Sequence, residues 1–195
     1  MCTKQNLLHA ILVISQESKN PLHSRCLEIL GNLSKFPENN EIMAMHPDLI
    51  AKLVESAKSD IDEDRVWSLR TLQNISASTS GKNMMIRKYT LELLSSSALR
   101  SQHLEEQSAA LSALHNLSTE AGCLVALTNT KDVVAALIHI AHEPNTPSPL
   151  RLIACATLTM LGLWIQTLAG AGTVPPAIEE TPLPTFVSTG WKRFD

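Results

Sequence analysis

The feature that most constrains this chain is a short phrase that returns at almost fixed spacing. Its copies begin at positions 30, 72, 114 and 158, so they are 42, 42 and 44 residues apart. A second, apolar ladder keeps the 42-residue period. Two ladders with one period predict a stacked helical solenoid, in which each repeat packs on its neighbours. The copies are Leu30-Gly31-Asn32-Leu33-Ser34, Leu72-Gln73-Asn74-Ile75-Ser76, Leu114-His115-Asn116-Leu117-Ser118 and the degenerate Leu158-Thr159-Met160-Leu161-Gly162; the second ladder is Leu7, Leu49, Leu91 and Val133.

Apolar periodicity divides each full period into three predicted helices. They cover 37–45, 48–58 and 61–77, then 80–87, 90–99 and 102–119, then 121–127, 132–142 and 149–163, while the first period supplies only 5–15 and 21–34. The expected N-caps are Asp60 or Asp62, and Asp48, Thr90 and Asp132. We therefore expect an all-α chain with a partial repeat at 1–35, repeats at 36–77 and 78–119, a degenerate repeat at 120–166 and a Pro- and Gly-rich tail at 167–195.

Composition agrees with helix packing and excludes several classes of function. Aromatic residues make up only 4%, so aliphatic side chains must build the core. A net charge of −3 gives no basic surface for nucleic acid. The apolar stretches 7–14 and 150–171 are too short or too interrupted by polar residues, so we expect no membrane span and a cytoplasmic or nuclear protein. The cysteines form no CxxC pair, and we expect Cys26 and Cys155 to be small core residues.

A three-helix repeat of about 42 residues with Leu-x-Asn-[Leu/Ile]-Ser in its third helix resembles the armadillo family, over residues 5 to 163. The resemblance implies a right-handed superhelix whose third helices line a concave groove. It also implies that Asn32, Asn74 and Asn116 hydrogen-bond the backbone of an extended peptide. Import receptors of this family carry Trp four residues before the Asn, where this chain has Glu28, Arg70 and Ser112, which argues against a groove for nuclear-localisation signals. Met160 replaces the fourth Asn, so the groove should weaken there.

Helical periodicity alone supports a binding face on the third helices. At 100° per residue, the residues four and seven before each Asn share its face, away from the leucine stripe. An Asn side chain offers a donor and an acceptor, as a peptide backbone requires. Trp and Arg are enriched in binding hot spots. The alternatives are a solvated polar face, an Asn that caps a neighbouring helix, and a Trp packed on the next repeat. The candidate peptide-binding residues are Arg25, Glu28, Asn32, Trp67, Arg70, Asn74, Ser112 and Asn116.

No motif in the sequence indicates catalysis. The pair His139 and His142 lacks the HExxH arrangement of a zinc enzyme. The acidic run 60–64 lacks the ligand spacing of a calcium loop. We therefore expect no cofactor, no metal and no enzyme, but a scaffold that binds extended segments of other proteins. Two alternatives remain, a structural extension of a larger scaffold and the substrate-recruiting arm of a ubiquitin ligase or chaperone assembly.

The two ends of the chain lead to separate expectations. Near the start, an apolar set with no cover suggests that further repeats precede Met1; it comprises Leu7, Leu8, Ile11, Leu12 and Ile14. After Thr167 the pattern fails, since Gly170, Gly172 and four prolines follow. The last stretch, 186–195, contains Phe186, Trp191 and Phe194 and is interpreted either as a short docking peptide or as a segment without structure.

Overall fold

A computed structural model describes residues 2–15 and 22–171, and this part of the chain is entirely helical, with eleven helices and no strand. A short helix is followed by two longer ones in the repeats α6–α8 and α9–α11, whereas α3 and α4 both have 8 residues before the longer α5. The helices are α1 (Cys2–Ser15), α2 (His23–Ser34), α3 (Pro37–Ala44), α4 (Leu49–Ser56), α5 (Asp62–Ile75), α6 (Thr79–Met85), α7 (Lys88–Arg100), α8 (Leu104–Ser118), α9 (Ala121–Asn129), α10 (Lys131–His142) and α11 (Ser148–Ala171).

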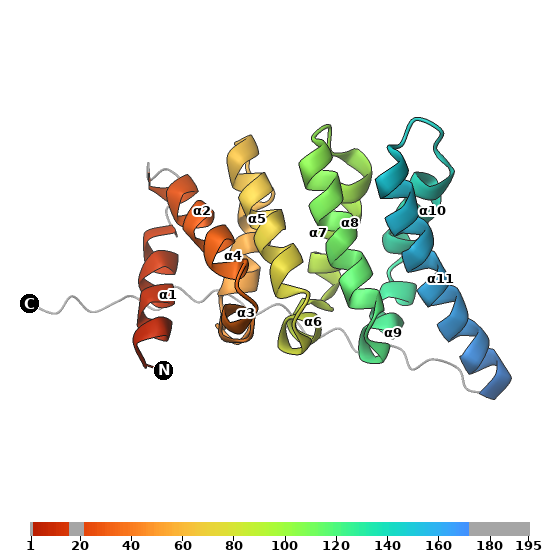
Figure 1. Cartoon of the computed structure of the whole chain (residues 1–195), viewed down its shortest axis with the longest axis horizontal. Helices are drawn as coiled ribbons and strands as arrows, with labels where there is room; N and C mark the ends of the chain where they lie inside the picture. Colours follow the sequence, from red (N-terminus) through yellow and green to blue (C-terminus); the bar gives the residue numbers. More distant parts are fainter. Residues whose placement is uncertain (1, 16–21, 172–195) are drawn as a thin grey trace, which may run out of the picture.

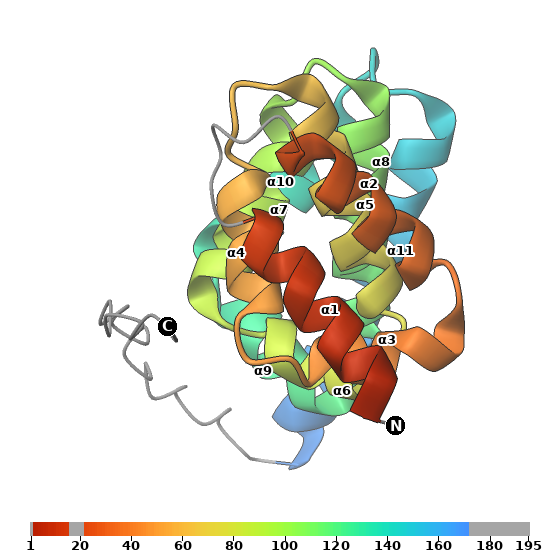
Figure 2. The same cartoon turned by 90° about the vertical axis from the view of Figure 1, so that its left-hand side faces the viewer.

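The helices stack along the longest axis of the molecule (Figure 1). The third helices α2, α5, α8 and α11 form one layer in which each contacts the next. The second helices α1, α4, α7 and α10 lie behind them, and the short helices α3, α6 and α9 run along one edge (Figures 1 and 2). This arrangement is compatible with an α-helical repeat solenoid.

The repeated phrase builds the core between the layers. Its apolar residues at the first and fourth positions are fully buried in α5 and α8, as Leu72, Ile75, Leu114 and Leu117 show. The second ladder is buried at Leu49, Leu91 and Val133, but Leu7 is 56% exposed. Burial of one such side chain contributes about 1.5–3 kcal/mol, so each buried member of the ladders stabilises the stack.

The N-caps differ from those expected. Asp62 is the first residue of α5 and Ile61 occupies its N-cap, without a side-chain cap. The hydroxyl of Ser59 accepts a hydrogen bond from the Ile61 amide and donates one to the Asp64 carboxylate, both at 3.1 Å. A serine two residues before the cap therefore replaces the predicted aspartates. Among the described hydrogen bonds at this helix start, those of Ser59 are made by a residue that lies even further from the N-cap than Asp60, and Asp60 makes none.

The expected caps of the second helices are also wrong in part. Asp48 occupies the N-cap of α4 but makes no side-chain cap hydrogen bond. Thr90 and Asp132 lie inside α7 and α10, which begin earlier than their apolar pattern indicates. The extensions are two residues in α7 and one in α10, and they leave Leu91 and Val133 on the buried face.

The ends of the stack correct three other expectations. In α1, Leu8, Ile11 and Leu12 are buried, so only part of the apolar set there lacks a cover. The last helix runs to Ala171 instead of ending near residue 163. Cys26 is buried as expected, but Cys155 is exposed. Residues 172–195, including Phe186, Trp191 and Phe194, lie outside the described part of the chain.

One helix of the described residues is long and apolar enough to cross a membrane. The stretch is Ser148–Gln166 in α11, and 22% of it is buried. Only its length and its apolar composition qualify it as a possible membrane-spanning helix. One side of it packs on α8 and α10.

Candidate functional site

The candidate site is the exposed surface of α2, α5, α8 and α11, called here the third-helix face. All eight residues selected from the sequence lie on three of these helices: Arg25, Glu28 and Asn32 on α2, Trp67, Arg70 and Asn74 on α5, and Ser112 and Asn116 on α8. Arg25 and Asn32 are exposed and the other six are partly buried. The helical periodicity thus brings the set to one side of the stack.

Trp67 is held firmly between two repeats. A Cβ atom added to Gly31 of α2 would lie 2.5 Å from Cε3 of Trp67, so the indole ring occupies the space that a side chain there would need. Glycine at this position therefore lets α5 seat its tryptophan against α2. Trp67 therefore packs on the adjacent repeat and is still partly exposed on the third-helix face.

Two cations flank the Trp67 ring. The Lys35 ammonium lies 5.8 Å and the Arg70 guanidinium 5.5 Å from its centroid. Cations at such distances are attracted by the face of the indole ring. We call Lys35, Trp67 and Arg70 the Trp67 cluster. Lys35 was missed in the sequence because only positions before the Asn were considered; its backbone is still helical, so three residues after Asn32 it lies on the same face.

Ion pairs hold the charged candidate residues of the face in place. Arg70 pairs with Glu105 at 3.0 Å, and Arg25 pairs with Glu28 at 2.7 Å. The hydrogen bond from Arg25 to Glu28 raises the pKa of the guanidinium above its ordinary value. These exposed pairs add little to stability. Their effect is to orient the side chains that a ligand would meet.

The asparagines join successive repeats. The Asn74 amide donates to the Ser34 hydroxyl at 2.9 Å, and the Asn116 amide donates to the Ser76 hydroxyl at 3.0 Å. Asn116 also donates to the Gln73 carbonyl, at 3.3 Å. We call each of these pairs an asparagine–serine lock. Of the alternatives considered for the asparagines, a bond to the neighbouring helix therefore applies to the amide nitrogens of Asn74 and Asn116.

The oxygen side of the same amides is still available. Within the described residues, Oδ1 of Asn74 and Oδ1 of Asn116 accept no hydrogen bond, and both side chains are partly exposed. Oδ1 of Asn32 accepts from the Lys35 ammonium at 2.8 Å. An amide oxygen of this kind can accept the N–H of an extended peptide.

The lock ends before the last repeat. Met160 stands at the Asn position of α11 and is 36% exposed. The junction between α8 and α11 has instead a contact of 3.3 Å between Nδ1 of His115 and the hydroxyl of Thr157. In the described residues, the junction between α8 and α11 therefore has no asparagine–serine lock, and the expected weakening of the groove there stays a prediction.

Two buried carboxylates lie beneath the amino-terminal ends of α5 and α8. Asp64 accepts hydrogen bonds from Ser24 at 2.6 Å and from Ser59, and it lies 3.6 Å from Nε2 of His23. Glu106, 42 positions later, accepts from Arg65 at 3.0 Å and from Ser101 at 2.8 Å. Asp64 belongs to the acidic run 60–64, and the recurrence of an acid 42 residues later, at Glu106, is the sequence signal for this buried position.

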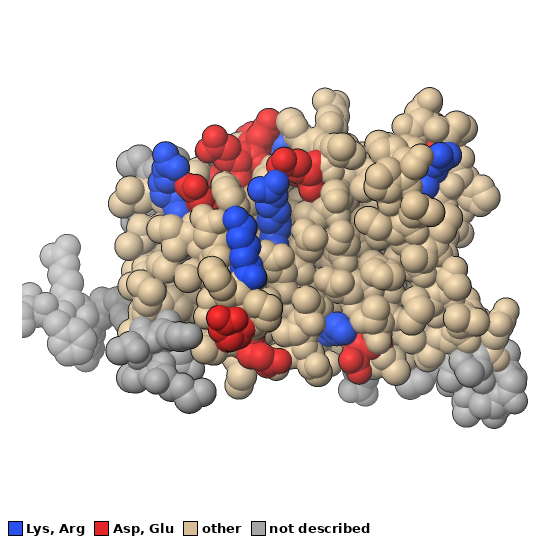
Figure 3. Space-filling model, viewed as in Figure 1, with Lys and Arg blue, Asp and Glu red and all other residues tan. Residues whose placement is uncertain are grey.

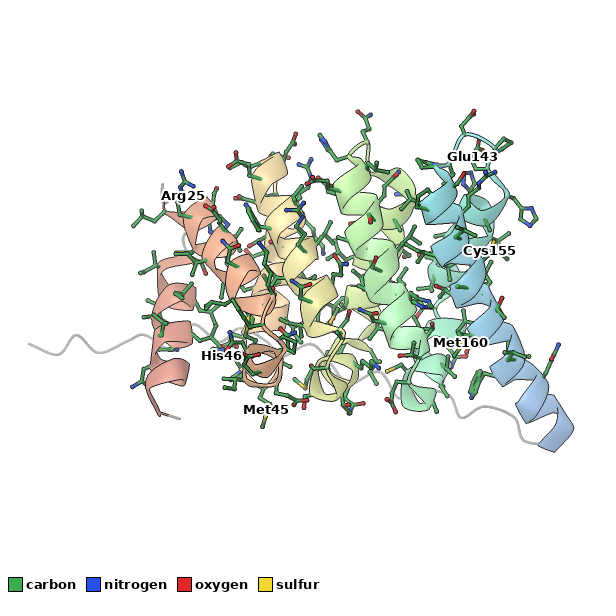
Figure 4. All side chains as sticks on the ribbon, viewed as in Figure 1. Arg25, Met45, His46, Glu143, Cys155 and Met160 are labelled. Carbon is green, nitrogen blue, oxygen red and sulfur yellow. The ribbon has the colours of Figure 1, made fainter. Side chains whose placement is uncertain are left out.

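Charge divides the third-helix face into two halves. Charged side chains gather over α2, α5 and the adjoining end of α8, and the surface over the rest of α8 and α11 is largely uncharged (Figure 3). Arg25 lies on α2 at the charged end of the face, and Cys155 and Met160 lie on α11, whose single charged residue is Arg151 (Figure 4). A ligand that follows the whole face would meet polar groups first and apolar groups later.

The opposite layer holds a shallow hollow of about 370 Å³ between α7 and α10. Tyr89, Glu92 and Arg100 of α7 line it, together with Asp132 of α10.

Within the described residues, no three His, Cys, Asp or Glu side chains are grouped so as to hold a metal ion.

Comparisons with known proteins inform the fold alone. No family model matches the chain, and no curated protein matches it. Among solved structures, the chain is similar to a crystal structure of an engineered protein, with 18% identity and a TM-score of 0.69. The match covers 85% of this chain and 68% of the engineered one. The likeness supports the all-helical architecture.

Proposed function

We propose that this chain is an armadillo-type, non-enzymatic scaffold that binds an extended segment of a partner protein along the third-helix face. The Trp67 cluster is the observation that carries the proposal. Its aromatic ring is braced against Gly31 and flanked by two cations, so it is positioned before a ligand arrives. A rigid aromatic side chain beside an arginine is the usual composition of a hot spot.

The asparagines have a double role in this proposal. Their amide nitrogens hold the preceding repeat through the locks, and their Oδ1 atoms face the ligand. The lock fixes the amide in one orientation, which lowers the entropy cost of a further hydrogen bond. Arg25, Glu28 and Arg70 would set the preference for ligand side chains, and Ser112 would extend the polar row onto α8.

The experiment compares two variants that separate the lock from the ligand. Ser34→Ala removes the lock and leaves the Asn74 amide on the face, whereas Asn74→Ala removes both. Proteins captured from a native extract by the wild type are identified by mass spectrometry, and the affinity of each is then measured by titration. We expect Ser34→Ala to retain binding and Asn74→Ala to weaken it 5- to 100-fold, roughly 1–3 kcal/mol. Trp67→Ala should weaken it as well.

A second candidate function is structural, with these repeats extending a larger scaffold. The locks favour it, since they give the asparagines a purpose without any ligand. In that case no partner would depend on Trp67, Arg70 or Asn74, and Ser34→Ala and Asn74→Ala would have equal effects on stability and none on capture.

A further inference from the structure

The two ends of the helix stack expose apolar side chains. At one end, Leu22 and Ile29 on the outer edge of α2 are 53% and 46% exposed. At the other end, Leu152 and Leu163 of α11 are 70% and 57% exposed. These helices lie at opposite extremes of the long axis (Figure 1). Exposed apolar side chains grouped on one edge of a helix mark a surface that another element can cover.

The repeat register identifies the exposed edge of α11 as a surface that receives a third helix. Within the chain, Ser24 of α2 bonds Asp64 of α5, and Lys35 after α2 lies over Trp67. The receiving positions are therefore that of Ser24, which is partly buried, and that of Lys35, which contacts α5 at its margin and stays exposed. Their counterparts in the later repeats are Val66, Ser108 and Leu152 for the first, and Ala77, Thr119 and Leu163 for the second.

The same register identifies the outer edge of α2 as a surface that inserts into such a receiver. The residues of α5 that contact α2 are Asp64, Trp67, Thr71 and Asn74. Their counterparts 42 positions earlier are Leu22, Arg25, Ile29 and Asn32. In α5 this edge is covered by α2, whereas in α2 its counterpart is exposed within the described structure.

The chemistry of the two edges matches. Inside the chain, the contact between the Ser24 and Asp64 positions is polar and buried. At the two ends, the same positions are held by Leu152 and Leu22, so an apolar receiver faces an apolar inserter. Arg25 already pairs with Glu28 of its own helix, so an approaching α11 would not isolate its charge. Exposed Leu7 on α1 and Ile138 on α10 extend the apolar ends to the second layer.

We propose that copies of this chain associate head to tail, with α11 of one copy receiving α2 of the next and Leu152 packed against Leu22. The contact continues the stacking of α2, α5, α8 and α11 across the boundary between copies. A second copy is the occupant because α2, α5 and α8 are each covered by the inserting edge of the next third helix, and this chain itself exposes such an edge on α2. A dimer formed through two different surfaces still has one free surface of each kind, so assembly proceeds beyond the dimer, either to an open filament or to a closed ring.

The test uses the full chain and two variants with one blocked end each. Leu152→Asp/Leu163→Asp blocks α11, and Leu22→Asp/Ile29→Asp blocks α2. All four side chains are exposed, so the helices should form, which circular dichroism checks. Sedimentation equilibrium of the wild type should give a mass that rises with concentration beyond twice the 21.3 kDa of one chain. Each variant alone should remain monomeric. Their equimolar mixture should form a dimer and nothing larger, because one working end remains on each.

A matched control is Leu104→Asp in the middle of the stack. Leu104 is 56% exposed, and its counterpart one repeat earlier is Asp62, so the position accepts the substitution. This variant should assemble as the wild type does. If an Asp pair unfolds, Leu152→Ser/Leu163→Thr replaces it, since the counterparts of these residues in α8 are Ser108 and Thr119.

Three results would overturn the proposal. The first is a wild type that stays monomeric at every concentration; if removal of residues 172–195 then permits association, that segment is the occupant of α11. The second is a dimer of the α2-blocked variant alone, which would indicate that two copies of α11 pair with each other. The third is a mixture of the two variants that contains only monomers.

Discussion

The side-chain amide of Asn74 donates to the hydroxyl of Ser34 at 2.9 Å, although 40 residues separate them in the chain. Ser34 in turn donates its proton to the Gly31 carbonyl of its own helix, at 2.8 Å. One serine therefore closes its own last turn and binds the next repeat. Asn116 and Ser76 repeat this arrangement one period later. The conspicuous phrase of the sequence is thus a joint between repeats as well as a row of polar groups.

The first prediction concerns the energy of this joint. Ser34→Ala and Asn74→Ala should each lower the free energy of unfolding by about 1 kcal/mol, because each leaves a partly buried polar group without its partner. The double variant should lose about 0.5–1.5 kcal/mol less than the sum of the two, since the second substitution removes a bond that is already broken. Urea unfolding followed by circular dichroism measures all four proteins.

The control for the joint is Asn32→Ala. Asn32 is exposed, and its described hydrogen bond is to Lys35 of the same turn. Its removal should change stability by less than about 0.5 kcal/mol. An equal loss at Asn32 and Asn74 would show that the joint contributes nothing specific.

A second prediction compares two glycines in the short helices of successive repeats. A Cβ atom on Gly81 would lie 1.9 Å from the Ile75 carbonyl oxygen, whereas one on Gly122 would meet nothing within 4 Å. Gly81→Ala must displace backbone and should destabilise by about 2 kcal/mol or more. Gly122→Ala relieves the poor helix propensity of glycine and should stabilise by up to about 1 kcal/mol. Thermal unfolding of both variants should give shifts of opposite sign; shifts of the same sign would contradict the close approach of α6 to Ile75.

Much of the fold follows from periodicity. The spacing of the leucines determines which side of each helix is buried, and the order of short and long helices follows from the same pattern. The N-caps do not follow, because a cap is defined by backbone angles over two or three residues. Ser59 and Asp60 are equally good candidates by type. The turn that precedes α5 places only Ser59 where it can reach the Ile61 amide.

The sequence predicts which face of the helices carries the candidate residues, but it does not predict the contacts that these residues make. Helical geometry places Trp67, Arg70 and Asn74 on one side of α5 whatever surrounds them. The side on which a neighbour approaches depends on how the repeats rotate against each other. For this reason the sequence could not show that Gly31 makes room for Trp67, or that the Asn74 nitrogen is bound by Ser34 while its oxygen is not.

The third prediction concerns the buried acids. Asp64→Asn keeps the shape of the side chain but removes the charge that accepts from Ser24 and Ser59 and faces His23. The variant should lose about 1–3 kcal/mol of unfolding free energy. Glu63→Gln, at an exposed neighbour in the same first turn, serves as the control and should cost less than about 1 kcal/mol, the part due to the helix dipole. Equal effects at both positions would mean that the acids act only through the dipole.

The last prediction concerns the cysteines and alkaline pH. Burial raises the pKa of the Cys123 thiol from 9.0 to about 11, and the nearby Glu120 acts in the same direction. The folded state therefore holds this proton when the unfolded state has released it, so the contribution is complete below pH 9 and is lost as the pH rises toward 11. The unfolding free energy should fall across this window by at most about 2–3 kcal/mol. Cys123→Ala should reduce this fall in unfolding free energy.

The burial of Cys123 can also be checked by labelling. At pH 8, iodoacetamide followed by mass spectrometry should label exposed Cys155 long before buried Cys123, and labelling of both at one rate would contradict the burial of Cys123.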